Sequence, residues 1–241
     1  MSINNILPFL STIVMLIFTL SVFQRYLVRR NPAFLFWSIG LLMFGSGSFA
    51  EAYLSLSWSP VIFYIWYLFG AALNAAWLGH GTLALLVKKR WVSVVTIILV
   101  VGSLLAGVLM LTTPLDAGSF EPGVAISEQY RAIMPQGAPV RLTTPFFNIY
   151  GMITLVGGAI YSAYLFWRKR VLPNRVIGNV LIAVGALSIG FASSLTRLGY
   201  GQYLYIGELL AATLMYIGFR AAAGPKPETE TAAQTTPAGA R

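Results

Sequence analysis

Residues 88–113 have the sequence KKRWVSVVTIILVVGSLLAGVLMLTT, in which three basic residues are followed by an uncharged, mostly apolar run. The hydrocarbon core of a bilayer is about 30 Å thick, and an α-helix that rises about 1.5 Å per residue crosses it with about 20 residues. The run therefore predicts a membrane-spanning helix at 92–113. With 57% hydrophobic and 10% charged residues, the whole chain lies outside the range of soluble proteins.

Six further runs of this kind lie on either side, at 6–24, 33–55, 60–87, 145–167, 175–196 and 202–220. Backbone polar groups inside lipid must find partners within their own segment, so runs of this length predict helices rather than the strands of a barrel. We expect an all-α fold, a polytopic seven-transmembrane-helix bundle within residues 1–223. Because the basic cluster follows the first run instead of preceding it, that run is expected to be an uncleaved anchor rather than a signal peptide.

Basic charge alternates strictly between successive connections. One set of connections holds twelve of the sixteen Lys and Arg residues: Arg25, Arg29, Arg30, Lys88, Lys89, Arg90, Arg168, Lys169, Arg170, Arg175, Arg220 and Lys226. The other set holds Arg131, Arg141 and Arg197. Positive charge is retained on the cytoplasmic side, so we expect a multi-pass protein of the cell inner (plasma) membrane with its N-terminus outside and its C-terminus inside. The net charge of +9 is then a topological signal, and no nucleic-acid partner is expected.

Two segments lie outside the predicted bundle. The proline-bearing outer loop 114–144 is longer than an ordinary connection, and such loops are usually functional or disordered. Its Phe120, Tyr130, Ile133 and Met134 indicate that it folds over the mouth of the bundle. Residues 224–241, rich in Pro, Thr, Ala and Glu, predict a disordered cytoplasmic tail.

Self-comparison of the chain gives weak matches at an offset of 138 to 141 residues. Matching groups include Leu41, Gly45 and Ser48 with Leu181, Gly185 and Ser188, and Tyr64, Leu68 and Ala71 with Tyr205, Leu209 and Ala212. The order of the matches indicates a 3+1+3 parallel repeat about an axis along the membrane normal. Shared apolar composition is the alternative explanation.

In topology the chain resembles the SWEET and PQ-loop transporters and the rhodopsin-like seven-helix proteins, although it lacks their signature residues. Its Pro135-Gln136 pair lies in the outer loop, and the seventh span contains no lysine. The pattern from Phe34 to Val87, the outer loop and residues 147–151 (FNIYG) resemble uncharacterised bacterial seven-helix integral membrane proteins. That resemblance implies the fold and no particular activity.

Three ionisable residues lie inside the spans, where a charge at the centre costs about 2.5–3.5 kcal/mol. Glu51 and Glu208 both lie about 6–9 Å below the outer edge of the membrane, and Arg197 is the nearest basic residue. They are candidates for a ligand-binding or proton-coupled cluster, and a structural ion pair is the alternative. If the two carboxyl groups face each other without Arg197, one of them should keep its proton, because like charges repel strongly in a low dielectric.

His80 lies about 12 Å from the inner edge and cannot reach the two glutamates. As the only histidine it cannot form a multi-histidine zinc centre or a bis-histidine haem site, so it either bonds a neighbouring helix or relays protons. Asn74 and Trp77 share a helix face with Gly70 and Gly81. They either line a binding site or hold the bundle together.

The sequence contains no combination of nucleophile, base and orienting group, so we expect no catalytic residues, no metal or cofactor, and no enzyme activity. Transport or receptor-like binding of a small or lipid-like ligand between the two three-helix halves is the function that we expect, with the lipid bilayer as surroundings. The alternative is a structural or accessory subunit that packs against a larger membrane complex or a second copy of the chain.

Overall fold

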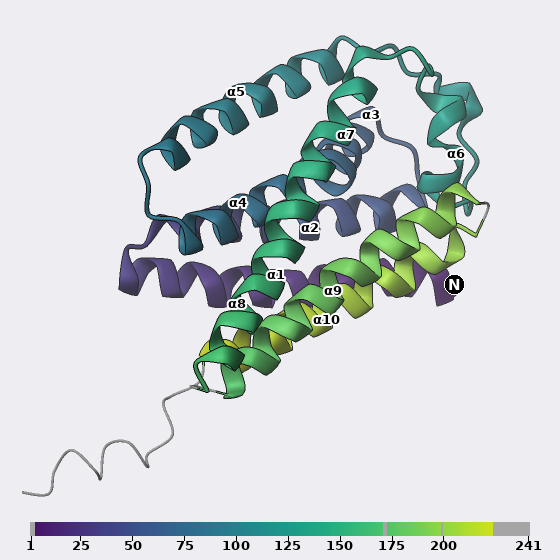
Figure 1. The fold of residues 1–241 in the computed structure, drawn as a ribbon. Coiled ribbons are helices and arrows are strands. Elements are labelled where there is room, and N and C mark those ends of the chain that lie inside the picture. Colours follow the sequence, from purple (N-terminus) through teal and green to yellow (C-terminus); the bar gives the residue numbers. More distant parts are fainter. Residues whose placement is uncertain (1–2, 171–172, 199, 224–241) are drawn as a thin grey trace, which may run out of the picture.

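The computed structural model of the protein describes residues 3–170, 173–198 and 200–223. These residues form helices and no strands, and seven of their helical segments are long and apolar enough to cross a membrane (Figure 1). The spans are Ile6–Arg29, Pro32–Leu54, Pro60–Leu86, Trp91–Leu111, Pro139–Arg168, Pro173–Thr196 and Tyr203–Ala223. The predicted seven-helix bundle is thus confirmed, while the predicted tail 224–241 lies outside the described residues.

Five spans are single helices: α1 (Ile3–Arg29), α2 (Pro32–Leu54), α5 (Trp91–Leu111), α9 (Pro173–Arg197) and α10 (Gln202–Ala223). The third and fifth spans each contain a π-helical segment. The third is α3 (Pro60–Ile65), η1 (Trp66–Leu73) and α4 (Asn74–Leu86), and the fifth is α7 (Pro139–Met152), η3 (Ile153–Gly157) and α8 (Gly158–Arg168). A π-helical turn shifts the faces of the flanking helix relative to each other, and such turns are frequent at functional sites.

Prolines set the beginnings of several spans. Pro32, Pro60 and Pro139 each stand in the first turn of a helix, where the missing N–H costs nothing. Asn31 caps the first of these helices, because its side chain accepts a hydrogen bond from the amide of Ala33 at 3.0 Å. The fifth span begins at Pro139 rather than at residue 145 as expected, and Pro145 lies inside the helix.

Helix α2 contacts α1, η1 and α4. Helix α9 pairs closely with α10, α8 packs on α9, and α1 contacts α10. Helix α5 stands apart from this group in Figure 1, and it is the least buried of the spans. Within the bundle, glycines let helices approach closely: the backbones of Gly47 and Gly70 meet between α2 and η1, and Gly151 of α7 lies against the backbone of Ala75 in α4.

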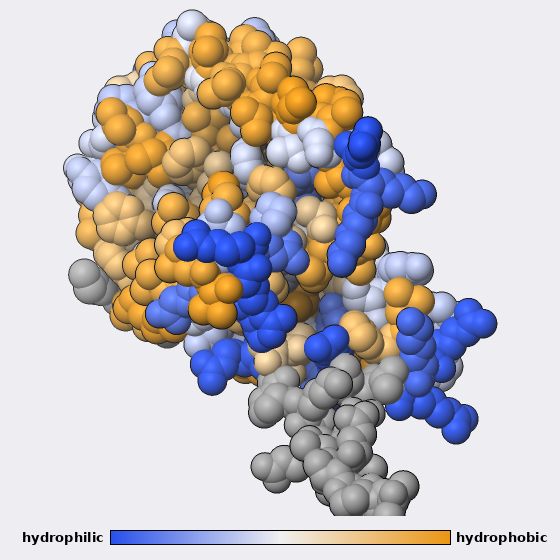
Figure 2. Space-filling view, turned by 90° about the vertical axis from the view of Figure 1, so that its left-hand side faces the viewer, coloured by the Kyte–Doolittle hydropathy of each residue, from blue (hydrophilic) through white to orange (hydrophobic). Residues whose placement is uncertain are grey.

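The bundle has two unlike ends. Most basic residues stand at the end where α1, α4, α8 and α10 finish, which we call the basic end. Figure 2 looks toward it and shows hydrophilic side chains gathered there, next to a largely hydrophobic surface. The opposite end, which we call the α6 end, carries η2 (Ala117–Ser119) and α6 (Ile126–Ile133).

The connection between α5 and α7 folds onto the α6 end. Ile126, Ile133 and Met134 are buried there in a cluster with Phe63 and Leu54. The backbone is fixed as well, since the amide of Gly123 donates to the carbonyl of Ser55 at 3.1 Å. The connection therefore covers the α6 end of the bundle, as its apolar residues indicate.

Candidate functional site: a buried carboxyl pair

Glu51 and Glu208 come together in the interior below the α6 end. Glu51 lies in the last turn of α2 and is 3% exposed, and Glu208 lies in α10 and is 7% exposed. The indole Nε1 of Trp66 donates to Oε1 of Glu51 at 2.9 Å, and the hydroxyl of Ser48 donates to Oε2 of Glu208 at 3.3 Å. Ser48 precedes Glu51 by three residues on one helix face, so α2 supplies both a carboxyl group and a donor to the pair.

The second carboxyl oxygen of Glu51 has no hydrogen-bond partner among the described atoms, although it is buried. The side chains of Glu51 and Glu208 lie within hydrogen-bonding reach of each other, so the two carboxyl groups can bond directly once one of them carries a proton. Buried polar atoms are almost always hydrogen-bonded, so an oxygen in this position needs an explanation. A proton between the carboxyl groups, or a donor group of a ligand, would supply the missing partner and relieve the repulsion of two negative charges.

Aromatic side chains surround the two carboxyl groups. Trp66 contacts Phe63, Tyr67 and Tyr130 with ring centroids 5.5, 6.1 and 5.7 Å apart. Tyr205 is buried three residues before Glu208 on α10. The carboxyl groups therefore lie in apolar surroundings, where every electrostatic interaction is stronger than in water.

Helix α6 and its flanks close the site from the α6 end. Tyr130 of α6 packs on Trp66, and the guanidinium group of Arg141 stands 5.1 Å over the Tyr130 ring. On the other side, the Glu128 side chain lies against Gly201, just before α10. Helix α6 thus bridges α3, η1 and the α9–α10 turn.

The charges around Tyr130 affect its ionisation. Burial alone raises the pKa of Tyr130, but the hydrogen bonds and positive charges of Arg131 and Arg141 outweigh burial, and the pKa falls below its ordinary value. The Arg131 Nε donates to the Tyr130 hydroxyl at 3.4 Å. The predicted third member of the cluster, Arg197, ends α9, and its side chain lies outside the described residues.

His80 belongs to a separate network in the other half of the bundle. Its Nδ1 lies 2.8 Å from the Tyr150 hydroxyl and its Nε2 lies 2.8 Å from the Thr96 hydroxyl. The Thr96 hydroxyl donates its one hydrogen to the carbonyl of Val92, so Nε2 donates to Thr96, and in the neutral ring Nδ1 then accepts from Tyr150. The neutral ring thereby ties α4 to α5 and α7.

Asn74 and Trp77 also have partners of their own. The Asn74 amide donates to the carbonyl of Gly70 at 2.9 Å, and the Asn148 amide donates to the carbonyl of Ala71 at 3.1 Å. Both carbonyls belong to η1, and π-helical geometry leaves such groups in need of other donors. The Trp77 indole donates to Ser103 of α5 at 3.2 Å. The structure therefore brings together Glu51 and Glu208 and leaves Asn74, Trp77 and His80 outside their site.

Ser48 and Tyr205 also belong to the site, although the sequence indicates them only as positions of the repeat. Each stands three residues before a buried glutamate, and this helical spacing was a signal that could have found them. Within the described residues, no group of three or more His, Cys, Asp or Glu side chains could hold a metal ion. Comparisons with known protein families, curated proteins and solved structures find no match to this chain.

Proposed function

We propose that this membrane protein handles a small or lipid-like ligand, by transport or receptor-like binding, and that Glu51 and Glu208 are the polar centre of its site. The observation that carries the proposal is the buried, unpartnered carboxyl oxygen of Glu51 beside a second buried carboxyl group. Ionisable groups at membrane depth are costly and commonly mark ligand or proton pathways. The role is a binding role and not an enzymatic one.

The chemistry of the pair favours a ligand with a hydrogen-bond donor or a positive charge. A proton shared by Glu51 and Glu208 would keep the empty site neutral enough to be buried. An amine or a similar donor group would replace that proton and bond both carboxyl groups, so that binding and proton release would be coupled. The aromatic wall of Phe63, Trp66 and Tyr205 would hold the apolar part of such a ligand.

The positive-inside rule orients this site in the membrane. If the basic end faces the cytoplasm, α6 covers the outer face, with the N-terminus outside and the C-terminus inside an inner (plasma) membrane. The carboxyl pair then opens outward, between the halves formed by the first three and the last three spans. A ligand would reach it only when α6 moves away from Trp66.

A second function, that of an accessory subunit, is favoured by α5. This helix exposes an apolar face that includes Ile97, Ile98, Val101 and Leu105, each more than half exposed, and it contacts the rest of the bundle lightly. Lipid covers such a face equally well, whereas an accessory subunit does not require two buried carboxyl groups side by side. We therefore place ligand handling first.

Native mass spectrometry of the protein purified in mild detergent distinguishes the two functions. The proposal predicts a retained small-molecule mass on the parent and on Glu121→Gln, a matched control at an exposed glutamate of the α5–α7 connection, and its loss from Glu51→Gln and Glu208→Gln. A retained protein subunit, with no small molecule on any variant, would support the accessory function instead.

A further inference from the structure

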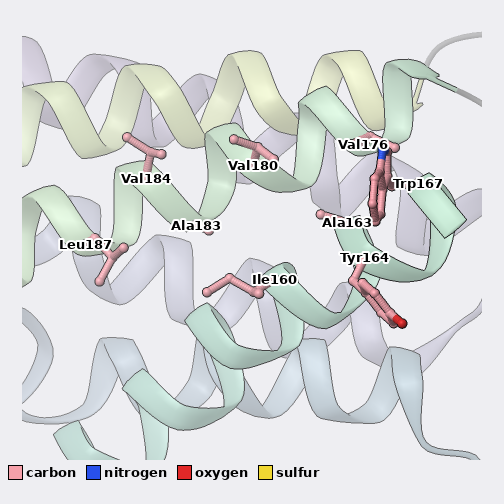
Figure 3. Close-up of a pocket in the computed structure, with 9 residues that line it drawn as sticks. All are labelled: Ile160, Ala163, Tyr164, Trp167, Val176, Val180, Ala183, Val184 and Leu187. Atoms are coloured by element: carbon pink, nitrogen blue, oxygen red, sulfur yellow. The ribbon is translucent and has the colours of Figure 1, made fainter.

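An apolar groove of about 440 Å³ lies between α8 and α9, away from the carboxyl pair (Figure 3). It is lined by Ile160, Ala163, Tyr164, Trp167, Val176, Val180, Ala183, Val184 and Leu187. Two of these residues, Ala163 and Ala183, are buried small residues, whereas Val180, Val184 and Leu187 are nearly half exposed. The groove is hollow because alanines occupy positions where larger side chains would fill it.

The length of the groove matches one leaflet of a bilayer. Its lining on α9 runs from Val176 to Leu187, about 16 Å at 1.5 Å per residue. The hydrocarbon core is about 30 Å thick, so the groove extends through about half of it. A single acyl chain has the shape and the chemistry to lie there.

Two large aromatic side chains stand at the end of the groove that faces the basic end. Figure 3 shows Tyr164 and Trp167 at this end beside Val176, and Leu187 at the other. Tyrosine and tryptophan favour the headgroup level of a membrane. The groove therefore begins at headgroup depth and continues into the hydrocarbon layer.

Positive charge gathers at the same end. Arg168, Lys169 and Arg170 directly follow Trp167, and Arg175 directly precedes Val176, with its guanidinium group 5.4 Å over the ring of Phe166. Residues 158–198 include no Asp or Glu. Arg25 of α1 lies close enough to Arg175 for the two charges to repel each other. A phosphate group placed here would relieve that repulsion.

We propose that the groove between α8 and α9 is a binding site for one anionic phospholipid, with an acyl chain along Val176–Leu187 and the phosphate on Arg168 and Arg175. Basic clusters next to gaps between membrane helices bind anionic headgroups in this way. The site is independent of the carboxyl pair and of the function proposed for it.

The test uses delipidated full-length protein in detergent, titrated with phosphatidylglycerol or with phosphatidylcholine of the same chains and followed by native mass spectrometry. We expect at least fivefold weaker binding of phosphatidylcholine. We also expect at least fivefold weaker binding of phosphatidylglycerol to Val184→Trp, which fills the exposed side of the groove, and to Arg168→Gln/Arg175→Gln. Thermal unfolding and gel filtration of each variant check that it is folded.

Two matched controls keep the test specific. Val101→Trp adds the same side chain to the exposed face of α5, and Lys88→Gln/Lys89→Gln removes the same charge from another connection at the basic end. Both should bind phosphatidylglycerol like the parent. The proposal is overturned if the two lipids bind equally, if the controls weaken binding as much as the groove variants, or if Val184→Trp abolishes a dimer instead of lipid binding. Should Val184→Trp fail to fold, Val180→Phe serves in its place, and the arginine variant decides independently.

Discussion

Replacing Gly151 by alanine tests how tightly the first and second halves of the bundle are joined. A β-carbon at Gly151 would lie 2.5 Å from the carbonyl oxygen of Ala75 and 2.7 Å from the amide nitrogen of Ala76. The carbonyl carbon of Ala75 lies closer still, and ordinary contacts begin at 3.4 Å, so α7 and α4 must separate by about 1 Å. Overpacking of this kind costs about 1–3 kcal/mol, and the upper value applies because rigid backbone lies on both sides.

Alanine is also more favourable than glycine in a helix by about 1 kcal/mol. Gly151→Ala should therefore lower the free energy of unfolding by about 2 kcal/mol in all. Gly107 on α5 is the matched control, because a β-carbon there meets nothing within 4 Å. We expect Gly107→Ala to gain about 0.5–1 kcal/mol. The free energy of unfolding, measured by denaturing detergent in mixed micelles, should separate the two variants by about 3 kcal/mol. Equal stability of the two variants would refute the close contact of α7 with α4.

Two further predictions concern polar networks outside the carboxyl pair. Tyr150→Phe removes the donor to His80 and should lower the free energy of unfolding by about 1–3 kcal/mol, because a buried ring nitrogen is left unpaired. A double-mutant cycle with His80→Phe should show that the two effects are coupled. Additive effects would contradict the network. Tyr130 should ionise below the ordinary tyrosine pKa of about 10 in alkaline absorbance titrations, and Arg131→Gln/Arg141→Gln should raise that pKa. Because its folded pKa lies below the unfolded value, Tyr130 stabilises the fold above the unfolded pKa, and that contribution disappears as the pH falls through the folded pKa. A titration identical in the parent and the double variant would contradict this account.

The seven spans could be predicted because length and hydropathy alone decide whether a helix crosses a membrane. The start of the fifth span could not, since Pro139 and Pro145 are both able to begin a helix and only packing distinguishes them. The π-helical segment at 66–73 has no sequence signal, because its residues would suit an α-helix equally well. It is stabilised by the amide of Asn148, a residue of a different span.

The level of Glu51 and Glu208 along their helices could be predicted from the sequence. Whether the two side chains face each other could not. Counting residues from the helix ends placed Glu51 and Glu208 at one level, because helical rise is constant. Their meeting depends on how α2 and α10 rotate within the bundle. The donors Ser48 and Trp66 depend on that rotation too, and Trp66 also on the π-helical turn that it begins.

We expect Glu51 and Glu208 to form a buried pair that holds a proton until a ligand displaces it. A membrane-permeant carbodiimide reacts with protonated carboxyl groups in apolar surroundings, and peptide mass spectrometry locates the modified residue. At neutral pH we predict modification of one glutamate of the pair per chain, none at Glu51 or Glu208 in the double variant Glu51→Gln/Glu208→Gln, and an unchanged pattern in Glu121→Gln, a variant of an exposed glutamate. Absence of modification at both Glu51 and Glu208 in the folded parent would contradict the account.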